Sequence, residues 1–518
     1  MNGAESLVHT AVAAGVRVCF ANPGTTELDL VRALDDVPGI RAVLGLFEGV
    51  CSGAADGYGR MLDAPALTLL HLGPGLSNAA ANLHNARRAR SPVVNLVGQH
   101  ATWHLGADAP LTSDIAAMAG TVSRWVRTVS TASQLAGDVA QAVASARGGA
   151  GGVATLIVPA DCQSGDAASP ARPLTAEPLA QVPVERVERT AAALRQGAAA
   201  ALLLGGRALR QRGQWAAARV AARSGCRVVA EVFPARMERG AGLPRIERLP
   251  YFPDRVAASL AGLRTLVQAG AAAPVSFFGY GGTPSQLTPE GCALLPLASP
   301  EEDVEAALEA LADALDAPPA SSVLGFDQEP PPAGEGELTI ESVGPALAAL
   351  QPEGAIIVDE SGTTGAGYFH RSSGSPRHDY LALTGGSIGM GPPCALGAAI
   401  ACPGRTVVNL QGDGGAMYTL QALWTQARES LHVVTLVCAN RRYRILQLEL
   451  ARAGVASPGP LSRSLVDLSR PRLDWTQLAG GLGVEACSVE DVASLRKALA
   501  RAFAEPGPHL IEMVMADG

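Results

Sequence analysis

The chain has 518 residues, which is enough for about three domains of ordinary size. Hydrophobic residues make up 48%, charged residues 17%, and the net charge is −8, so extended disorder and a nucleic-acid-binding surface are both disfavoured. Nine cysteines are spread singly without a CxxC pair, the N-terminus lacks signal-peptide features, and no apolar stretch reaches the ~18 residues that span a bilayer. The sequence therefore predicts a cytoplasmic protein with no membrane partner.

The first third of the chain has the rhythm of a parallel α/β sheet, because short apolar runs alternate with amphipathic helical stretches. We predict strands at residues 16–20, 42–46, 67–72, 93–97 and 153–158. Residues 162–184 are rich in Pro, Ser and Ala, which indicates a linker.

Two further α/β segments follow this linker. The first has predicted strands at 200–204, 227–231 and 275–278, and a Pro-rich segment over 318–336 separates it from the second. The second has predicted strands at 355–359, 405–410, 432–438 and 509–515. The predicted fold is α/β, with three doubly wound parallel-sheet domains near residues 1–165, 186–315 and 338–518.

In doubly wound sheets, ligands bind beyond the carboxyl ends of the strands, so the residues that follow each strand are the candidates for function. In the first domain these are the turn from Asn22 to Thr26, then Glu48, and then His71 with a Gly-Pro-Gly turn behind it. We therefore expect a carboxylate, an imidazole and small polar turns at one edge of this sheet.

The third domain places different chemistry at the same position. Gly412, Asp413, Gly414 and Gly415 follow one predicted strand, and Asn440 follows the next. Glycines at a helix N-terminus suit a diphosphate, because bare N–H groups and the helix dipole face the anion. Carboxylate and amide oxygens from neighbouring strands suit a bridging Mg²⁺ ion.

These motifs resemble those of thiamine-diphosphate (ThDP) enzymes of the acetolactate synthase and benzoylformate decarboxylase group. Gly412-Asp413-Gly414 followed 27 residues after the Asp by Asn440 is similar to the cofactor motif of this family. The segments 22–25, 70–71 and 412–425 are similar to benzoylformate decarboxylase in particular. The chain length also fits short acetolactate synthase large subunits. The resemblance covers both terminal domains and, more weakly, the middle one.

The resemblance implies roles for the third domain, which would bind the cofactor diphosphate. Asp413, the Asn440 side chain and the Arg442 carbonyl would hold Mg²⁺. Ile388 would be the apolar wedge that bends the cofactor, and the Gly386 carbonyl would accept a hydrogen bond from its amino group. The cofactor-binding set that the resemblance implies here is Thr363, Gly386, Ile388, Gly412, Asp413, Gly414, Gly415, Asn440 and Tyr443.

For the first domain, the resemblance implies binding of the cofactor pyrimidine. Glu48 would hydrogen-bond a pyrimidine nitrogen and so promote ylid formation, while His71 and Thr25 would handle protons on the substrate side. The implied reaction forms or cleaves a C–C bond beside the carbonyl of a 2-oxo acid. The implied assembly is a homodimer or homotetramer in which the first domain of one subunit faces the third domain of another.

Several alternatives stay open at this stage. Decarboxylation, condensation of two 2-oxo acids as in acetolactate synthase proper, and a catalytically silent regulatory paralogue are all compatible with the motifs. Ala439 and Gly415 depart from the family pattern, and none of the nine histidines lies between residues 105 and 369, where benzoylformate decarboxylase has its second active-site histidine. A dinucleotide-dependent dehydrogenase is disfavoured, because no Gly-x-Gly-x-x-Gly follows the first strand.

Overall fold

The computed structural model describes residues 1–167, 169–197, 199–322, 326–327, 329–455 and 457–516. The chain forms two compact units. Unit 1 comprises residues 1–177, 332–369 and 383–518, and unit 2 comprises residues 178–331 and 370–382. The three domain boundaries expected from the sequence remain a prediction. Among the described residues, every helix is too short or too polar to cross a bilayer.

The N-terminal part of unit 1 is a six-stranded parallel sheet with the order β2-β1-β3-β4-β6-β5. Its strands are β1 (Val18–Asn22), β2 (Arg41–Leu44), β3 (Ala66–Leu70), β4 (Val93–Gln99), β5 (Trp125–Thr128) and β6 (Val153–Pro159). Its helices are α1 (Gly3–Ala13), α2 (Leu28–Asp36), α3 (Glu48–Leu62), α4 (Leu72–Ala89), α5 (Ile115–Gly120), α6 (Leu135–Arg147) and α7 (Ala160–Ser164).

The central strands of this sheet are buried on both faces, because successive apolar side chains point to opposite sides of the sheet. Leu67 and Leu69 of β3 join a core cluster with Leu7 of α1, Leu30 of α2 and Val139 of α6. On the other face, α3 and α4 pack against each other and against the strands. Helices therefore cover both faces, and the strand ends are left for a site.

The C-terminal part of unit 1 carries a second parallel sheet, with the order β17-β18-β16-β15-β13. Its strands are β13 (Ala355–Glu360), β15 (Val407–Gly412), β16 (Val433–Ala439), β17 (Glu485–Val489) and β18 (His509–Val514). Its helices are α12 (Ile340–Leu350), α13 (Thr363–Arg371), α14 (Gly391–Ala401), α15 (Asp413–Ala416), α16 (Ala422–Arg428), α17 (Arg444–Arg452), α18 (Pro460–Ser464), α19 (Trp475–Gly481) and α20 (Val492–Ala504).

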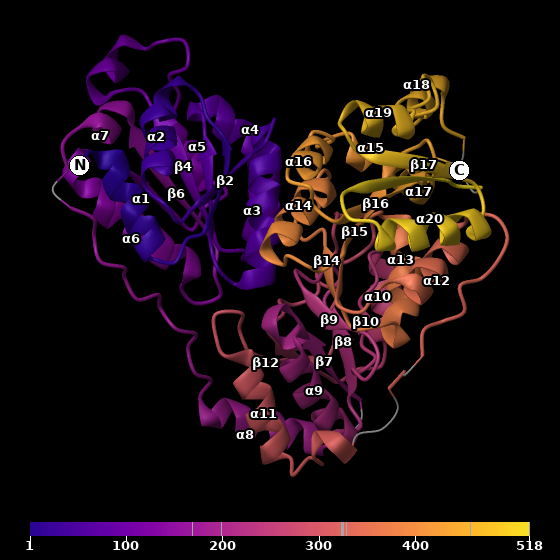
Figure 1. The fold of residues 1–518 in the computed structure, drawn as a ribbon. Coiled ribbons are helices and arrows are strands. Elements are labelled where there is room, and N and C mark those ends of the chain that lie inside the picture. Colours follow the sequence, from indigo (N-terminus) through magenta and orange to yellow (C-terminus); the bar gives the residue numbers. More distant parts are fainter. Residues whose placement is uncertain (168, 198, 323–325, 328, 456, 517–518) are drawn as a thin grey trace. The chain divides into compact units, whose positions relative to one another are not determined.

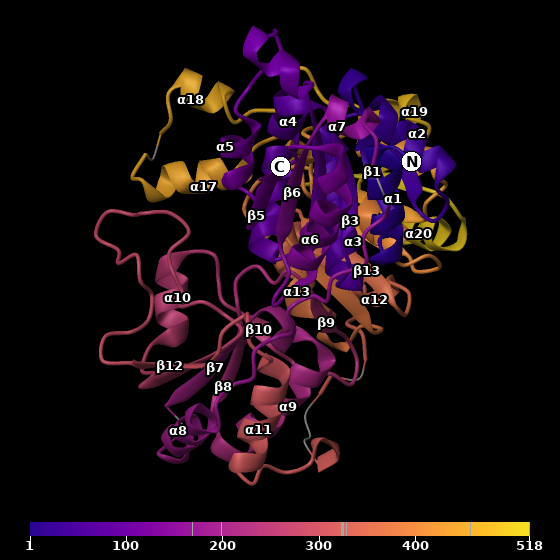
Figure 2. The same ribbon diagram turned by 90° about the vertical axis from the view of Figure 1, so that its left-hand side faces the viewer.

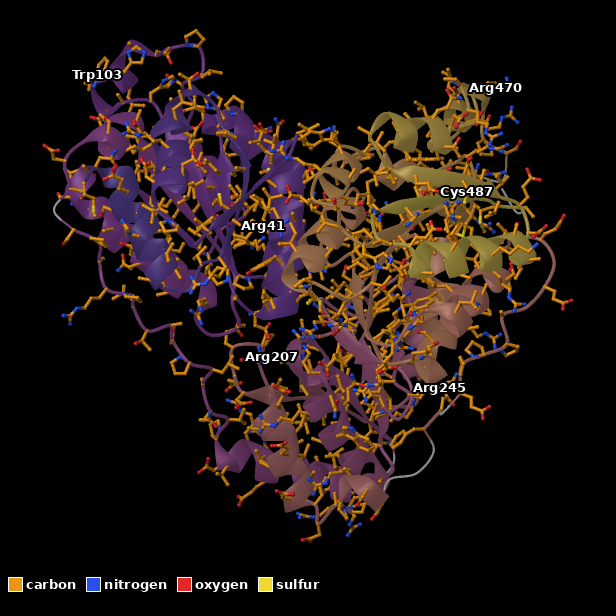
Figure 3. The ribbon with its side chains drawn as sticks, viewed as in Figure 1. Arg41, Trp103, Arg207, Arg245, Arg470 and Cys487 are labelled. Atoms are coloured by element: carbon orange, nitrogen blue, oxygen red, sulfur yellow. The ribbon has the colours of Figure 1, made fainter. Side chains whose placement is uncertain are left out.

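Helices α3 and α14 lie side by side and join the two sheets of unit 1 (Figure 1). Glycines make the close approach possible, since a Cβ on Gly57 would lie 2.1 Å from the Cys394 carbonyl oxygen, and one on Gly397 would lie 1.8 Å from that of Ala54. At the periphery of the same contact, Arg41 of β2, labelled in Figure 3, pairs with Glu429 just beyond α16.

Unit 2 contains the third sheet, with the parallel order β10-β8-β7-β11-β12, and the antiparallel pair β9–β14. Helices α8, α9 and α11 lie on one side of the sheet and α10 on the other (Figure 2). Its elements are β7 (Ala200–Leu204), β8 (Arg227–Ala230), β9 (Met237–Arg239), β10 (Glu247–Arg248), β11 (Thr265–Ala269), β12 (Ala293–Ala298), β14 (His378–Ala382), α8 (Val184–Arg195), α9 (Gln211–Ser224), α10 (Pro253–Leu260) and α11 (Val304–Ala314).

The predicted fold class, three parallel-sheet α/β domains, is confirmed by these three sheets. One strand prediction in unit 2 is wrong. The strand lies at Thr265–Ala269, whereas Val275 makes only an isolated bridge to Gln286. The physical reason is the flanking chain, because Pro274 and Gly279 bracket the short apolar run 275–278 and leave it within a turn-rich loop.

Candidate functional site

Glu48 is the first residue of α3 and lies at the carboxyl edge of the N-terminal sheet, only 8% exposed. The Asn78 side-chain amide of α4 donates a 2.9 Å hydrogen bond to its Oε2 atom. A Cβ on Gly75 would lie 3.1 Å from Glu48 Oε1 and 3.5 Å from His71 Cβ, so the side chains of Glu48 and His71 both lie near this glycine. The structure thus brings Glu48 and His71 together.

His71 caps the start of α4 and is paired with a buried carboxylate. Its Nδ1 atom lies 2.8 Å from Oε2 of Glu27, a residue with no exposed surface. The same Glu27 oxygen accepts the backbone N–H of Gly24 at 2.7 Å, and its other oxygen accepts the Thr26 hydroxyl at 2.5 Å. This network fixes the imidazole against the turn that follows β1.

The Thr26 hydroxyl lies within hydrogen-bond distance of His71, with Oγ1 3.3 Å from Nδ1. Thr25, the residue that the resemblance assigns to proton handling, is exposed at the start of a short 3₁₀ turn. Thr25 therefore faces the solvent side of the same edge, while Thr26 belongs to the hydrogen-bond network of Glu27 and His71.

The C-terminal sheet brings together Asp413 and Asn440. Gly412 of β15 pairs in register with Cys438 of β16, so the residues after these two strands are neighbours. Both Asp413 oxygens accept backbone N–H groups, Oδ1 from Gly414 at 2.8 Å and Oδ2 from Arg441 at 2.6 Å. Burial raises the pKa of Asp413 to about 6, against the lowering effect of these two N–H groups.

Two more of the predicted cofactor residues lie at the same sheet edge. Tyr443 packs its ring on Gly414, because a Cβ there would lie 2.3 Å from the ring carbon Cε1. Thr363 begins α13 just beyond β13, the strand beside β15. Next to Asn440, a pocket of about 450 Å³ is lined by Arg441, Arg442 and Arg463, among others, which makes this edge of unit 1 suited to anions.

Gly386 and Ile388 lie on the loop before α14, here called the 385–391 loop. Glu360, the last residue of β13, accepts the backbone N–H groups of Gly389 and Gly391, each at 2.5 Å. A Cβ on Gly415 would lie 2.7 Å from Glu360 Oε1, so this carboxyl sits between the loop and the Gly412–Gly415 turn. Burial raises its pKa to about 7, against the lowering effect of the loop N–H groups.

The sequence analysis assigned no role to three of these side chains. Glu27 directly follows the turn from Asn22 to Thr26, Asn78 is one of several helix asparagines, and Glu360 ends a strand. Only spacing could have found Asn78, because residues 78, 82 and 85 recur on one helix face. Nothing in the sequence pattern indicates that the Glu360 carboxyl turns inward toward the 385–391 loop.

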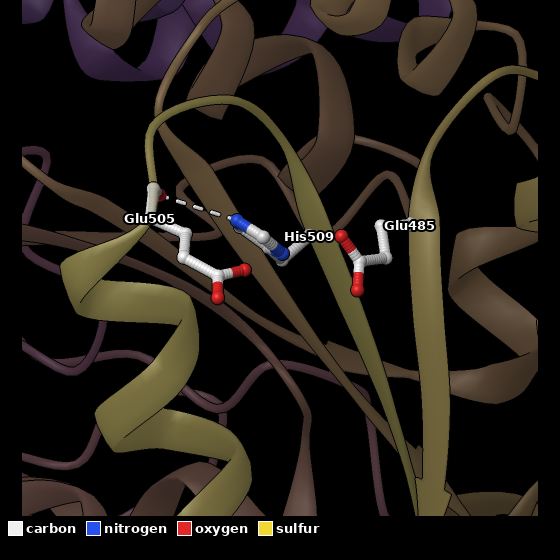
Figure 4. A group of neighbouring side chains, drawn as sticks. All are labelled: Glu485, Glu505 and His509. Carbon is white, nitrogen blue, oxygen red and sulfur yellow. Dashed lines mark hydrogen bonds between the residues drawn. The ribbon is translucent and has the colours of Figure 1, made fainter.

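Among the described residues, one group of His and acidic side chains has ligand atoms close enough for a metal, namely Glu485, Glu505 and His509, all within 4.8 Å (Figure 4). Arg501 already forms ion pairs with both glutamates. Glu485 and His509 begin β17 and β18, so this group lies at the sheet edge opposite to Asp413, which follows the end of β15. The Arg501 charge and this position argue against a catalytic metal here.

Comparisons with known proteins identify the family of this chain. Residues 1–119 match the family model described as the thiamine pyrophosphate enzyme N-terminal TPP binding domain, and residues 361–513 match the corresponding C-terminal TPP binding domain. A relative from Mycobacterium tuberculosis, named "Putative acetolactate synthase large subunit IlvX", is 50% identical over 516 residues, covering 99% of each chain. Benzoylformate decarboxylase from Pseudomonas aeruginosa is 29% identical over 96% of each chain.

The fold is also similar to that of solved structures. A solved Rhodococcus jostii RHA1 thiamine diphosphate-dependent 4-hydroxybenzoylformate decarboxylase superposes with a TM-score of 0.85 at 25% identity, covering 100% of both chains. The chain therefore belongs to the thiamine pyrophosphate enzymes. Within them it is a member of the ThDP-dependent acetolactate synthase and benzoylformate decarboxylase group.

Proposed function

We propose that this protein uses ThDP and Mg²⁺ to form or cleave a C–C bond next to the carbonyl of a 2-oxo acid. The observation that carries the proposal is the pair of strand-end groups in unit 1, with Glu48 and His71 at one sheet and Asp413 and Asn440 at the other. Both groups lie at carboxyl ends of parallel strands, where α/β sheets bind ligands.

The residues at the C-terminal sheet fit a diphosphate with its cation. Asp413 and Asn440 offer oxygen donors, and each Asp413 oxygen accepts a single N–H, which leaves a lone pair for a metal. The Arg442 carbonyl is the proposed third protein ligand. Gly414 has no side chain under the Tyr443 ring, and Gly412, Gly415 and Thr363 complete the proposed lining of the diphosphate. Gly386 and Ile388 are proposed to hold the other end of the cofactor.

When bound, ThDP supplies a carbon nucleophile and an electron sink for loss of CO₂. The chain's own residues would orient the reactants and move protons. Glu48 is the residue proposed to exchange a proton with the pyrimidine, and its 8% exposure and its hydrogen bond from Asn78 support this role. His71 is oriented by Glu27 and has an imidazole that can serve as acid or base toward the substrate. Thr25, at the exposed start of the turn after β1, is proposed to assist in proton handling from the solvent side.

We further propose that the active form is a cytoplasmic homodimer or homotetramer. The support is the resemblance in motif between this chain and a family in which two subunits build each site. The molar mass from sedimentation or light scattering tests this proposal, and a stable monomer that is fully active would overturn it.

The experiment that tests the reaction supplies the purified protein with ThDP, Mg²⁺ and a panel of 2-oxo acids that includes pyruvate, 2-oxobutyrate and benzoylformate. CO₂ release and product mass are followed together. An aldehyde product identifies a decarboxylase, and a product with a longer carbon skeleton identifies a carboligase such as acetolactate synthase proper. Binding of ThDP without consumption of any acid across a widened panel would favour the silent regulatory paralogue and contradict the proposed activity.

A further inference from the structure

Helix α4 carries three asparagines, Asn78, Asn82 and Asn85, on one face. The spacings of four and three residues place their side chains one above another along the helix. Asn82 is 3% exposed and Asn85 has no exposed surface, although asparagine is mostly found at protein surfaces. Buried amides are costly unless their hydrogen bonds are satisfied, so the partners of these side chains decide their role.

Asn85 pairs with both backbone polar groups of a single residue of the 385–391 loop. Its Nδ2 atom donates to the Ser387 carbonyl at 2.8 Å, and its Oδ1 atom accepts the Ser387 N–H at 3.2 Å. Ser387 lies between Gly386 and Ile388, the two residues proposed to hold the cofactor's aminopyrimidine end. The amide thus fixes the backbone at the centre of that loop.

Asn82, about one turn before Asn85 on the same helix, contacts both the 385–391 loop and α3. Its Nδ2 atom donates to the carbonyl of Gly389 at 3.3 Å and to that of Gly49 at 2.9 Å, while its Oδ1 atom accepts from Asn85 at 3.1 Å. Gly49 is the residue after Glu48, and Asn78 donates directly to Glu48. One helix face therefore contacts both the 385–391 loop and the first turn of α3.

The loop has independent anchors on its other side, which makes its position well determined. Glu360 accepts the N–H groups of Gly389 and Gly391, and the Thr419 hydroxyl donates to the Gly389 carbonyl at 2.9 Å. At its near end, Thr384 donates to the Asn85 carbonyl at 2.8 Å. A loop held between two sheets in this way presents its backbone to a ligand in one geometry.

We propose that Asn85, supported by Asn82, is a positioning residue that sets the 385–391 loop for the aminopyrimidine end of ThDP. This inference rests on the proposed function, because it assigns the loop to the cofactor. It predicts that loss of the Asn85 donor weakens ThDP binding without acting through the overall stability of the fold. The Asn85 side chain suits this role because its amide has a donor and an acceptor side by side, matching the C=O and N–H of Ser387.

The test is a ThDP titration in the presence of Mg²⁺, followed by calorimetry, on the wild type, N85D and N95D. Asn95 is the matched control, because it also has no exposed surface and bonds only to Thr68 and Thr155 within the N-terminal sheet. We expect N85D to weaken ThDP affinity by about 10-fold or more, since it loses donors to two buried acceptors. N95D should change affinity by less than about 3-fold at a comparable loss of thermal stability.

A second readout is the near-ultraviolet circular dichroism of the ThDP-loaded protein, which reports the environment of the bound pyrimidine ring. N85D should alter this spectrum and N95D should not. If N85D does not fold, N82A takes its place, with an expected loss of affinity of about 3-fold or more because one donor to the loop is removed.

The inference is overturned if N85D, or N82A in its place, binds ThDP as the wild type does with an unchanged spectrum. It is equally overturned if N95D loses as much affinity as N85D. Failure of the wild type itself to bind ThDP would instead contradict the proposed function, so the two failures are distinguishable.

Discussion

His71 and Glu27 form a carboxylate–imidazole pair in which Nδ1 lies 2.8 Å from Oε2 and the carboxylate is fully buried. Glu27 is held in this position by its own turn, because the Gly24 N–H and the Thr26 hydroxyl also donate hydrogen bonds to its carboxylate oxygens. The pair therefore has a fixed geometry before any substrate arrives, as proton-transfer groups need.

Substitution of Glu27 by Gln should lower turnover of the active 2-oxo acid by about 10-fold or more, because the amide cannot stabilise a positively charged imidazole as a carboxylate does. ThDP affinity should change little, since Glu27 lies in the network around His71. Kinetics of E27Q, H71A and the double variant check this. Additive losses in the double variant would show that Glu27 does not act through His71.

Gly24 gives an independent test of the same site. Its Cα faces the imidazole so closely that an added Cβ would lie 2.2 Å from His71 Nδ1. We expect G24A to displace the ring and to reduce turnover by about 10-fold or more. The control is G137A, since a Cβ at Gly137 in α6 meets no atom within 4 Å and should raise stability by ~0.5–1 kcal/mol. Equal turnover of the two variants would contradict the role of His71.

Glu48 is the residue whose loss should cost most. E48Q keeps the shape of the side chain and an acceptor for Asn78 but cannot exchange a proton, so we expect turnover to fall by about 100-fold or more. E5Q is a suitable control, because Glu5 is likewise a first-turn glutamate but serves only the cap of α1. Steady-state kinetics at saturating ThDP check this, and undiminished turnover of E48Q would contradict the role.

Stability should depend on pH through Glu360. Its pKa is raised from 4.5 to about 7 by burial, so the folded protein keeps a proton that the unfolded chain releases at lower pH. The folded state is therefore favoured below pH 4.5, and this contribution is lost as the pH rises toward 7. The glutamine side chain of E360Q does not titrate, so this variant lacks the pH-dependent contribution to stability.

Thermal denaturation of the cofactor-free protein at about pH 5.5 and pH 7.5 measures this effect. The difference in melting temperature between wild type and E360Q should be more favourable to the wild type at the lower pH. A difference that is constant across the two pH values would show that Glu360 does not titrate in this range.

The sequence predicted most of the strands that position the site because they are buried on both faces and read as continuous apolar runs. Edge strands were harder, and β5, with two exposed residues among Trp125–Thr128, has no such run. The candidate residues at strand ends followed from the α/β rule and the resemblance. Glu27, Asn85 and Glu360 did not, since their importance arises from which way a buried side chain turns and which loop it meets.

The most direct test of the central claim is calorimetric titration of ThDP into the protein with and without Mg²⁺, alongside D413A. We expect the wild type to bind ThDP in a Mg²⁺-dependent manner, and D413A to lose that dependence together with about 10-fold or more in affinity, because Asp413 supplies a charged oxygen at the proposed metal site. Absence of ThDP binding to the wild type in the presence of Mg²⁺ would contradict the claim.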